Sequence, residues 1–270
     1  MPAVARSEPF RGQGPCPLAV CDGSGWILND ENDEARPCEC RETRLRRGRN
    51  RGLASVIPRK FQGVSFDRPP VPQLPVEAVR STRRYIENLD QNLAAGKGIW
   101  FLGDIGTGKT TLAMLISKTA LEKGHSVAIY SMPVLLNRIR STYRAEGTED
   151  SYSKFFEKLV AVDLLHIDDL GAEKQTEWVI EQLYSIVNER YEAERAVMFT
   201  ANSHQIDQDD SDSRRERDRR GEKSELIVEK QIGRRTFSRL AEMCGDPVLL
   251  LGDDHRSSGH ELAPVIDIAP

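Results

Sequence analysis

The sequence lacks the features that would indicate a membrane protein, a secreted protein or a highly basic protein. No apolar run approaches the roughly 18 residues that a membrane-spanning helix needs. The opening residues MPAVAR do not form the apolar centre of a signal peptide. The net charge is −4, and no internal repeat is present. We therefore expect a cytoplasmic protein without membrane contact. In that setting its five cysteines are expected to be metal ligands or free thiols rather than disulfides.

The composition predicts a folded centre with polar flanks. The hydrophobic fraction of 39% is low but sufficient for a core, and the charged fraction of 30% is high. We expect a cysteine-rich region at 1–55, a proline-rich linker at 56–75 and a main domain at 76–256. Residues 205–225 are almost devoid of apolar side chains and are expected to be a disordered insert within that domain. Residues 257–270 form a tail.

A glycine-rich segment lies between the apolar run 98–102 and an apolar stretch that begins at Thr111. Its residues are Gly103, Asp104, Ile105, Gly106, Thr107, Gly108, Lys109 and Thr110. They match the pattern G-x-x-x-x-G-K-[ST], which is a phosphate-binding P-loop when a strand precedes it and a helix follows it. Backbone N–H groups and the positive end of the helix would surround the phosphates, with Lys109 on the β- and γ-phosphates and Thr110 on Mg²⁺. The segment, Thr111 included, is the predicted nucleotide site.

A second apolar stretch ends in two carboxylates, Asp168 and Asp169. At the tip of a buried strand beside the P-loop, Asp168 would hold Mg²⁺, directly or through water, and Asp169 would orient the attacking water. His166 lies inside this strand and is expected to be structural. Asn202 ends the next predicted strand, where its amide would contact the γ-phosphate or the attacking water; a turn residue is the alternative.

Strand and helix patterns alternate along the main domain. Strands are predicted at 98–102, 126–131, 163–171, 196–202 and 247–251, and helices at 76–94, 111–124, 132–145, 153–160, 178–191 and 233–240. This alternation predicts an α/β fold of the P-loop NTPase class, with a five-stranded parallel sheet and helices on both faces.

Four cysteines near the N-terminus could form a small zinc knuckle. They are Cys16, Cys21, Cys38 and Cys40. A tetrahedral Zn²⁺ uses thiolates from two cysteine pairs joined by a glycine turn. Here the first pair has the spacing C-x4-C, at the wide end of the usual range, and the second has the short spacing C-x-C. The alternative is four unconnected cysteines in a flexible arm. The stretch 41–60 that follows carries eight basic residues against one acid, which suits nucleic acid, a protein partner or a solvated arm.

Taken together, these motifs resemble the DnaC/IstB-like branch of the AAA+ ATPases, which contains bacterial helicase loaders and the ATPase subunits of certain transposases. The matching segments are 57–61, 107–110, 164–171, 199–202, 233–240 and 253–256. The resemblance covers about residues 56–256. The cysteine-rich front is similar to the zinc-binding N-terminal region of some helicase loaders.

The resemblance implies an ATPase that uses ATP and Mg²⁺, assembles with copies of itself when ATP is bound and contacts single-stranded DNA through the helix from Met132. Asn202 matches the sensor-1 position and Arg256 a sensor-2-like arginine. Arg239 matches the arginine finger that reaches the ATP of a neighbouring subunit, with Arg235 as the second candidate. The implied function is loading or remodelling of a replicative DNA helicase; the alternative is regulation of a transposase.

Two readings from other classes stay open on the sequence. A nucleotide or metabolite kinase also uses a P-loop but needs no arginine from a neighbour. A binding module would use ATP only as an assembly ligand. Because Asp169 stands where AAA+ enzymes commonly carry glutamate, slow hydrolysis is expected.

Overall fold

We analysed a computed structural model of the chain. It describes residues 16, 18–29, 34–41, 57–144, 149–171, 176–202, 225, 228–252, 254 and 255, except for the side chains of residues 28, 29, 34, 144 and 149–151. The predicted insert at 205–225 lies outside this description apart from its last residue, and so do the tail and most of the basic stretch.

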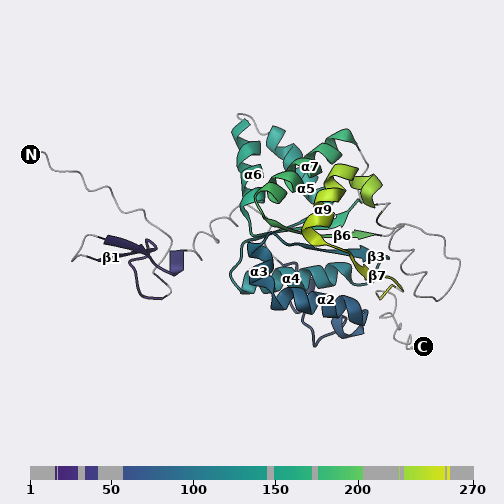
Figure 1. The fold of residues 1–270 in the computed structure, drawn as a ribbon, viewed down its shortest axis with the longest axis horizontal. Helices are drawn as coiled ribbons and strands as arrows, with labels where there is room; N and C mark the ends of the chain where they lie inside the picture. Colours follow the sequence, from purple (N-terminus) through teal and green to yellow (C-terminus); the bar gives the residue numbers. More distant parts are fainter. Residues whose placement is uncertain are drawn as a thin grey trace, which may run out of the picture.

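A parallel five-stranded sheet forms the centre of the main domain (Figure 1). Its strands are β3 (Ile99–Gly103), β4 (Val127–Ser131), β5 (Leu164–Leu170), β6 (Ala196–Asn202) and β7 (Val248–Leu250). Their order is β4-β5-β6-β3-β7. The predicted α/β class and the predicted number of strands are therefore confirmed. Since β6 lies between β3 and β5, the strand of the P-loop and the strand of the two aspartates are not direct neighbours.

Helices cover both faces of the sheet (Figure 1). On one face lie α2 (Val76–Glu87), α3 (Leu89–Ala94) and α4 (Lys109–Glu122), and on the other lie α5 (Met132–Arg144), α6 (Glu149–Ala161), α7 (Glu177–Glu192) and α9 (Arg234–Cys244). The helix predicted at 76–94 is divided at Asn88, whose backbone leaves the helical region and whose amide donates to Arg84 O. Within the described ranges, no helix is both long and apolar enough to cross a lipid bilayer.

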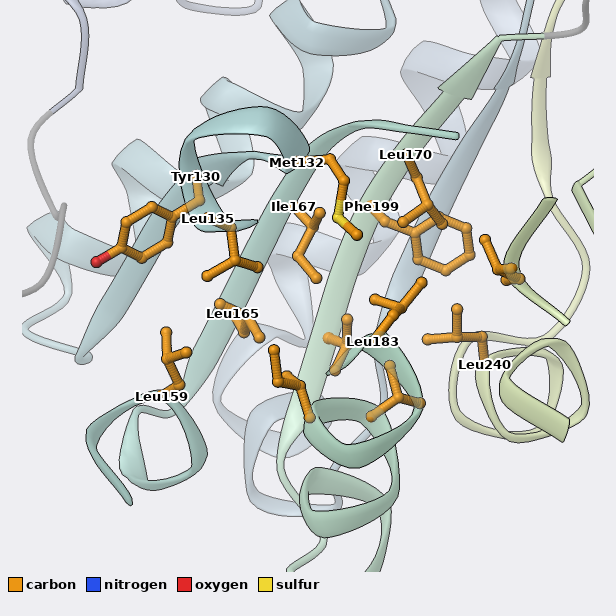
Figure 2. Packing of buried hydrophobic residues seen from close by; sticks show 14 of the residues in the cluster. Tyr130, Met132, Leu135, Leu159, Leu165, Ile167, Leu170, Leu183, Phe199 and Leu240 are labelled. Atoms are coloured by element: carbon orange, nitrogen blue, oxygen red, sulfur yellow. The ribbon is translucent and has the colours of Figure 1, made fainter. Parts of the chain in front are cut away.

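Each face of the sheet has its own apolar core. Trp100 and Leu102 of β3 point into the cluster under α5, α6, α7 and α9, while Ile99 and Phe101 point into the cluster under α2, α3 and α4. Figure 2 shows the first cluster, where Leu165 and Ile167 of β5 pack beneath the surrounding helices. Because both faces are covered, the strands are mostly apolar on both sides rather than alternating between apolar and polar residues.

The segment predicted as a linker packs against the second core. It contains two short 3-10 helices, η1 (Arg59–Phe61) and η2 (Val71–Gln73). Val64, Val71 and Leu74 are buried in the same cluster as α2 and α4. This burial attaches residues 57–75 to the main domain.

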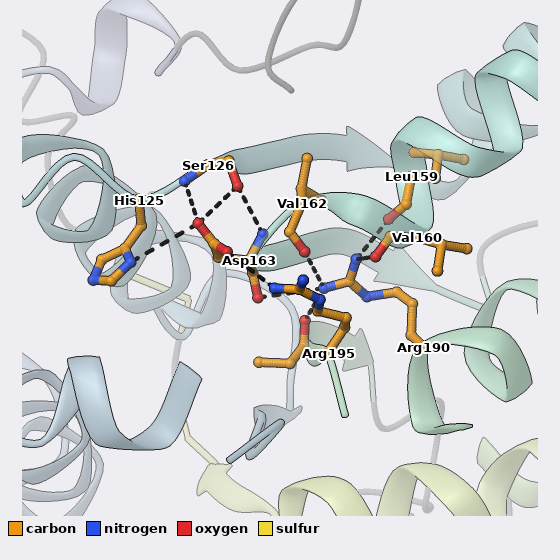
Figure 3. A network of polar contacts seen from close by, with 9 residues as sticks. His125, Ser126, Leu159, Val160, Val162, Asp163, Arg190 and Arg195 are labelled. Atoms are coloured by element: carbon orange, nitrogen blue, oxygen red, sulfur yellow. Dashed lines mark hydrogen bonds and ion pairs between the residues drawn. The ribbon is translucent and has the colours of Figure 1, made fainter. Parts of the chain in front are cut away.

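A buried arginine holds the starts of the strands in place, at the edge opposite the P-loop. The Arg190 guanidinium, fully buried on α7, donates to five backbone oxygens (Figure 3). They belong to Leu159, Val160, Val162, Asp163 and Ala196. Burial lowers the pKa of Arg190 to about 9. The Asp163 carboxylate accepts from the Ser126 N–H and hydroxyl and from Arg195. These contacts fix the ends from which β4, β5 and β6 begin.

The described N-terminal residues form a separate small hairpin. Strand β1 (Trp26–Asn29) pairs with β2 (Glu34–Pro37) in antiparallel fashion, with Trp26 opposite Pro37. Two strands of this length are not stable alone in water, so the hairpin needs a further constraint.

Candidate functional site

The predicted site residues gather at the carboxyl edge of the sheet. The P-loop follows β3, the two aspartates end β5, and Asn202 ends β6 directly opposite Gly103. In parallel α/β sheets, ligands bind outside this edge. The order β5-β6-β3 places Asn202 between the P-loop strand and the aspartate strand.

Lys109 begins α4 and is almost fully buried, with 5% of its surface exposed. Its ammonium group donates to Gly103 O at 3.1 Å and to Asp104 O at 2.5 Å, so the side chain folds back over the loop. The loop backbone and the start of a fourteen-residue helix face the same space. This combination of ammonium group, backbone N–H groups and helix dipole is suited to a polyphosphate.

At two positions of the loop, the backbone conformation and the neighbouring atoms leave room only for glycine. Gly106 and Gly108 have φ values of 81° and 95°, in the region that favours glycine. A Cβ atom on Gly106 would lie 1.9 Å from Asp254 Oδ1, and one on Gly108 would lie 2.5 Å from a methyl group of Leu74. The segment after β7 and the segment before α2 thus shape the loop, which the motif alone did not predict.

A hydroxyl and a carboxylate meet at the predicted Mg²⁺ position. Thr110 Oγ1 donates to Asp168, at 3.0 Å from Oδ1 and 3.3 Å from Oδ2. Thr200 Oγ1 donates to Asp168 Oδ1 at 2.7 Å. Hard oxygen donors at a strand tip beside a P-loop fit Mg²⁺, and no softer ligand is part of this set. The sequence analysis missed Thr200, whose only signal was its place two residues before Asn202.

The strand β5 is irregular at its two aspartates. The β5–β6 register shifts between Ile167 and Leu170, and Asp169 has a φ of 56°, rare for a residue with a side chain. Asp169 N donates to Thr200 Oγ1 at 2.9 Å, and Asn202 Nδ2 donates to Asp169 Oδ1 at 3.4 Å. The predicted water-orienting carboxylate and the predicted sensor amide are therefore in contact.

His166 lies behind this pair, fully buried. Its Nδ1 atom is 2.9 Å from Ser117 Oγ on α4, and its Nε2 atom is 3.9 Å from Asp168 Oδ1. Burial lowers the pKa of His166 to about 4, although the nearby Asp168 charge opposes that shift. The imidazole is therefore neutral at physiological pH.

The predicted arginines lie away from these contacts or outside the description. Arg239, half-buried on α9, places its guanidinium 4.7 Å from the ring centre of Tyr191 and 5.9 Å from that of Tyr184, both on α7. Arg235 is exposed on the same helix. Arg256 lies outside the described residues. The contacts of Arg239 are thus with α7 and not with the P-loop of its own chain.

The four N-terminal cysteines come together across the hairpin. The sulfur atoms of Cys16, Cys21, Cys38 and Cys40 all lie within 4.8 Å of one another. The sulfur atoms of Cys21 and Cys40 are 3.5 Å apart, and those of Cys16 and Cys38 are 3.9 Å apart. These distances exceed a disulfide bond and are close to the separation of about 3.8 Å between thiolates in a tetrahedron with Zn–S bonds of about 2.3 Å. The cluster therefore fits a tetrahedral zinc ion.

The thiol environments differ within this cluster. Backbone N–H groups, led by that of Cys21, lower the pKa of Cys16 to about 6, whereas burial raises the pKa of Cys40 to about 12. Zn²⁺ binds the thiolate form and favours loss of the proton. The fifth cysteine, Cys244, is half-buried on α9 and donates to Val197 O, away from the cluster.

The sheet, the P-loop and the paired aspartates define a P-loop protein of the AAA+ type. A family model described as "IstB-like ATP binding protein" matches residues 53–210, more than half of the chain. The chain belongs to this family of ATP-binding proteins, and the resemblance inferred from the motifs is confirmed.

Two curated relatives illustrate the similarity. The replicative helicase loader DnaC of Escherichia coli (strain K12) is 30% identical over 129 residues, which is 48% of this chain and 51% of that protein. The replicative helicase loader DnaI of Bacillus subtilis (strain 168) is 25% identical over 108 residues, or 40% of this chain and 33% of that protein. The chain thus spans about half the length, or less, of these relatives.

Solved structures share the fold. A crystal structure of the DnaC helicase loader has a TM-score of 0.55 and 22% identity, and covers 73% of this chain and all of that chain. The replication initiator DnaA bound to AMPPCP and single-stranded DNA has a TM-score of 0.53 and 18% identity, with 73% of this chain and 50% of that chain covered. At identities of 22% and 18%, these similarities show a shared fold.

Proposed function

We propose that the protein binds and hydrolyses ATP and uses this cycle to load or remodel a replicative DNA helicase. The contact between Thr110 and Asp168 carries the proposal, because it joins the P-loop to the aspartate strand at one point. A hydroxyl and a carboxylate in this arrangement are the protein ligands that a Mg²⁺–triphosphate site requires.

Each side chain at the sheet edge receives a role in this proposal. Lys109 and the loop N–H groups bind the phosphates, and Thr110 and Asp168 hold Mg²⁺, which neutralises phosphate charge when bound. Asp169 orients the attacking water, and Asn202 holds the Asp169 carboxylate while facing the γ-phosphate. Since an aspartate is shorter than the usual glutamate, slow turnover is expected.

The names of the two relatives support the choice of partner. Both are replicative helicase loaders, and neither is a transposase regulator. The cysteine-rich region at 1–55 would be a docking module for that partner, separate from the ATPase domain at 76–256 and from the segment 57–75 that packs on it. We further propose that the protein is cytoplasmic and assembles with copies of itself when ATP is bound. In this proposal α5 contacts single-stranded DNA, and Arg256 is a sensor of the nucleotide.

A capture experiment with two candidate partners tests the proposed function. Immobilised protein is incubated with a replicative helicase and, in parallel, with an IS21-type transposase, each with ATP or ADP. We expect at least about tenfold more helicase to be retained with ATP than with ADP, because ATP hydrolysis would weaken the contact with the partner. Retention of the transposase alone would support the alternative, and retention of neither protein would contradict a loader.

Arg239 is proposed to reach the ATP of a neighbouring subunit. We expect Arg239→Ala to lose turnover by about 1,000-fold or more, the scale typical of an arginine finger, with ATP affinity nearly unchanged. Mixing this variant with Lys109→Ala should restore part of the phosphate release, because the second chain supplies Arg239 to the ATP that the first chain holds. Turnover is measured as inorganic phosphate released per chain.

Arg235→Ala is the matched control on the same helix and should retain turnover. If the control is inactive and Arg239→Ala is active, the two arginines exchange roles. If neither arginine matters, a kinase-like site that needs no neighbour fits better. If the wild type binds ATP without releasing phosphate, with or without single-stranded DNA, ATP is only an assembly ligand.

A further inference from the structure

The inference concerns His166, a polar side chain in the middle of the buried strand β5. It is fully buried, and its Nε2 atom has no hydrogen-bond partner. Its neighbours in the sheet are Ile129 of β4 and Met198 of β6, both apolar. A buried N–H group without a partner destabilises a fold, so an apolar residue would fill this position at lower cost.

The two ring nitrogens of His166 lie near two different elements that carry site residues, the helix α4 and the end of β5. Nδ1 lies 2.9 Å from Ser117 Oγ, on the helix that begins with Lys109 and Thr110. Nε2 lies 3.9 Å from Asp168 Oδ1. The imidazole therefore bridges the P-loop helix and the aspartate strand from behind.

The chemistry of the two neighbours determines where the proton lies. A carboxylate only accepts hydrogen bonds, so the ring nitrogen that faces Asp168 is the one that carries hydrogen. Nδ1 is then the acceptor, and the Ser117 hydroxyl donates to it. The distance of 3.9 Å exceeds a hydrogen bond by about 1 Å, a gap that a small turn of the Asp168 carboxylate would close.

We infer that His166 is a positioning residue for Asp168: its Nε2–H group orients the carboxylate that receives Mg²⁺–nucleotide, and Ser117 fixes the ring to the P-loop helix. This role depends on the proposed nucleotide site and adds a residue to it. Donors that orient metal-ligating carboxylates act in this way, and their removal costs about 10- to 100-fold in metal affinity.

The test measures how nucleotide binding depends on Mg²⁺. A fluorescent ATP analogue is titrated into the full-length protein in EDTA and at stepped Mg²⁺ concentrations. For His166→Leu we expect the Mg²⁺ midpoint to rise about tenfold, while affinity in EDTA stays within about twofold. Met198→Leu, which changes a buried neighbour of equal volume, should leave the midpoint unchanged.

Two polar variants separate positioning from packing. The amide of glutamine reaches the place of Nε2 and that of asparagine the place of Nδ1. His166→Gln should therefore keep a midpoint within about threefold of the wild type, and His166→Asn should behave like His166→Leu. Equal Mg²⁺ midpoints for the leucine, glutamine and asparagine variants would overturn the positioning role. So would a midpoint near that of the wild type in His166→Asn alone. If the leucine variant does not fold, the comparison of glutamine with asparagine decides.

A nucleotide-free readout keeps this inference distinct from the proposed function. Nitrogen-15 NMR of labelled histidine should show His166 as the neutral Nε2–H tautomer, assigned by its loss in His166→Gln. An Nδ1–H tautomer would overturn the inference even if ATP binds as proposed. A wild type that binds no ATP would instead overturn the nucleotide site, and the positioning role with it.

Discussion

Lys109→Ala is expected to weaken ATP binding by about 100-fold and to abolish phosphate release. The ammonium group is buried at the start of α4 and already contacts the loop carbonyls of Gly103 and Asp104. A hydrogen bond to a charged group contributes about 1.5–3 kcal/mol, and the upper value corresponds to about 100-fold in affinity. Calorimetric titration with ATP and Mg²⁺ measures the loss.

Lys97→Ala is a suitable control for this experiment. Lys97 is exposed just before β3, so its loss removes a positive charge near the same strand without touching the loop. The control should bind ATP within about twofold of the wild type, since exposed charges contribute little. Thermal unfolding of both variants shows whether the buried substitution disturbs the fold. Unchanged ATP affinity in a folded Lys109→Ala protein would contradict the site.

Cys40→Ser is expected to remove the proposed zinc ion and unfold the hairpin of β1 and β2. The Cys40 sulfur is buried and 3.5 Å from that of Cys21, and a serine hydroxyl is a poor replacement for a thiolate ligand. A structural Zn²⁺ contributes about 10–16 kcal/mol to folding in modules of this kind, more than a short hairpin can replace. Elemental analysis should give one zinc per wild-type chain and almost none for the variant.

Cys244→Ser provides the matched thiol control. Cys244 lies on α9 of the main domain and donates to Val197 O, a bond that a serine hydroxyl can also make. This variant should retain one zinc, and the amide NMR signals of the hairpin should persist. ATP affinity should stay within about twofold in both cysteine variants, because the cluster lies outside the P-loop domain. A wild-type chain without zinc, or full zinc in Cys40→Ser, would rule out the four-cysteine site.

The two sites could be predicted from the sequence to different extents. The P-loop was predictable because its glycines, Lys109 and Thr110 lie within eight residues and act largely through local backbone geometry. The four cysteines were predicted as one set, but the sequence does not show how the hairpin of β1 and β2 brings Cys16 and Cys21 against Cys38 and Cys40. The break at Asn88 was missed because the apolar spacing continues through it, although the backbone does not.

The sequence by itself determined the strand–loop–helix that binds phosphate, the α/β class and the family, since these depend on short-range patterns. The tertiary structure alone decided which distant groups surround Asp168. Thr110 comes from α4 and Thr200 from β6, and the packing of both elements beside β5 brings the two hydroxyls to this carboxylate in a strand order that periodicity does not encode. The irregularity at Asp169 and the approach of Asp254 to Gly106 likewise depend on neighbouring segments. Contacts of this kind are set by packing between elements, for which a linear pattern carries no signal.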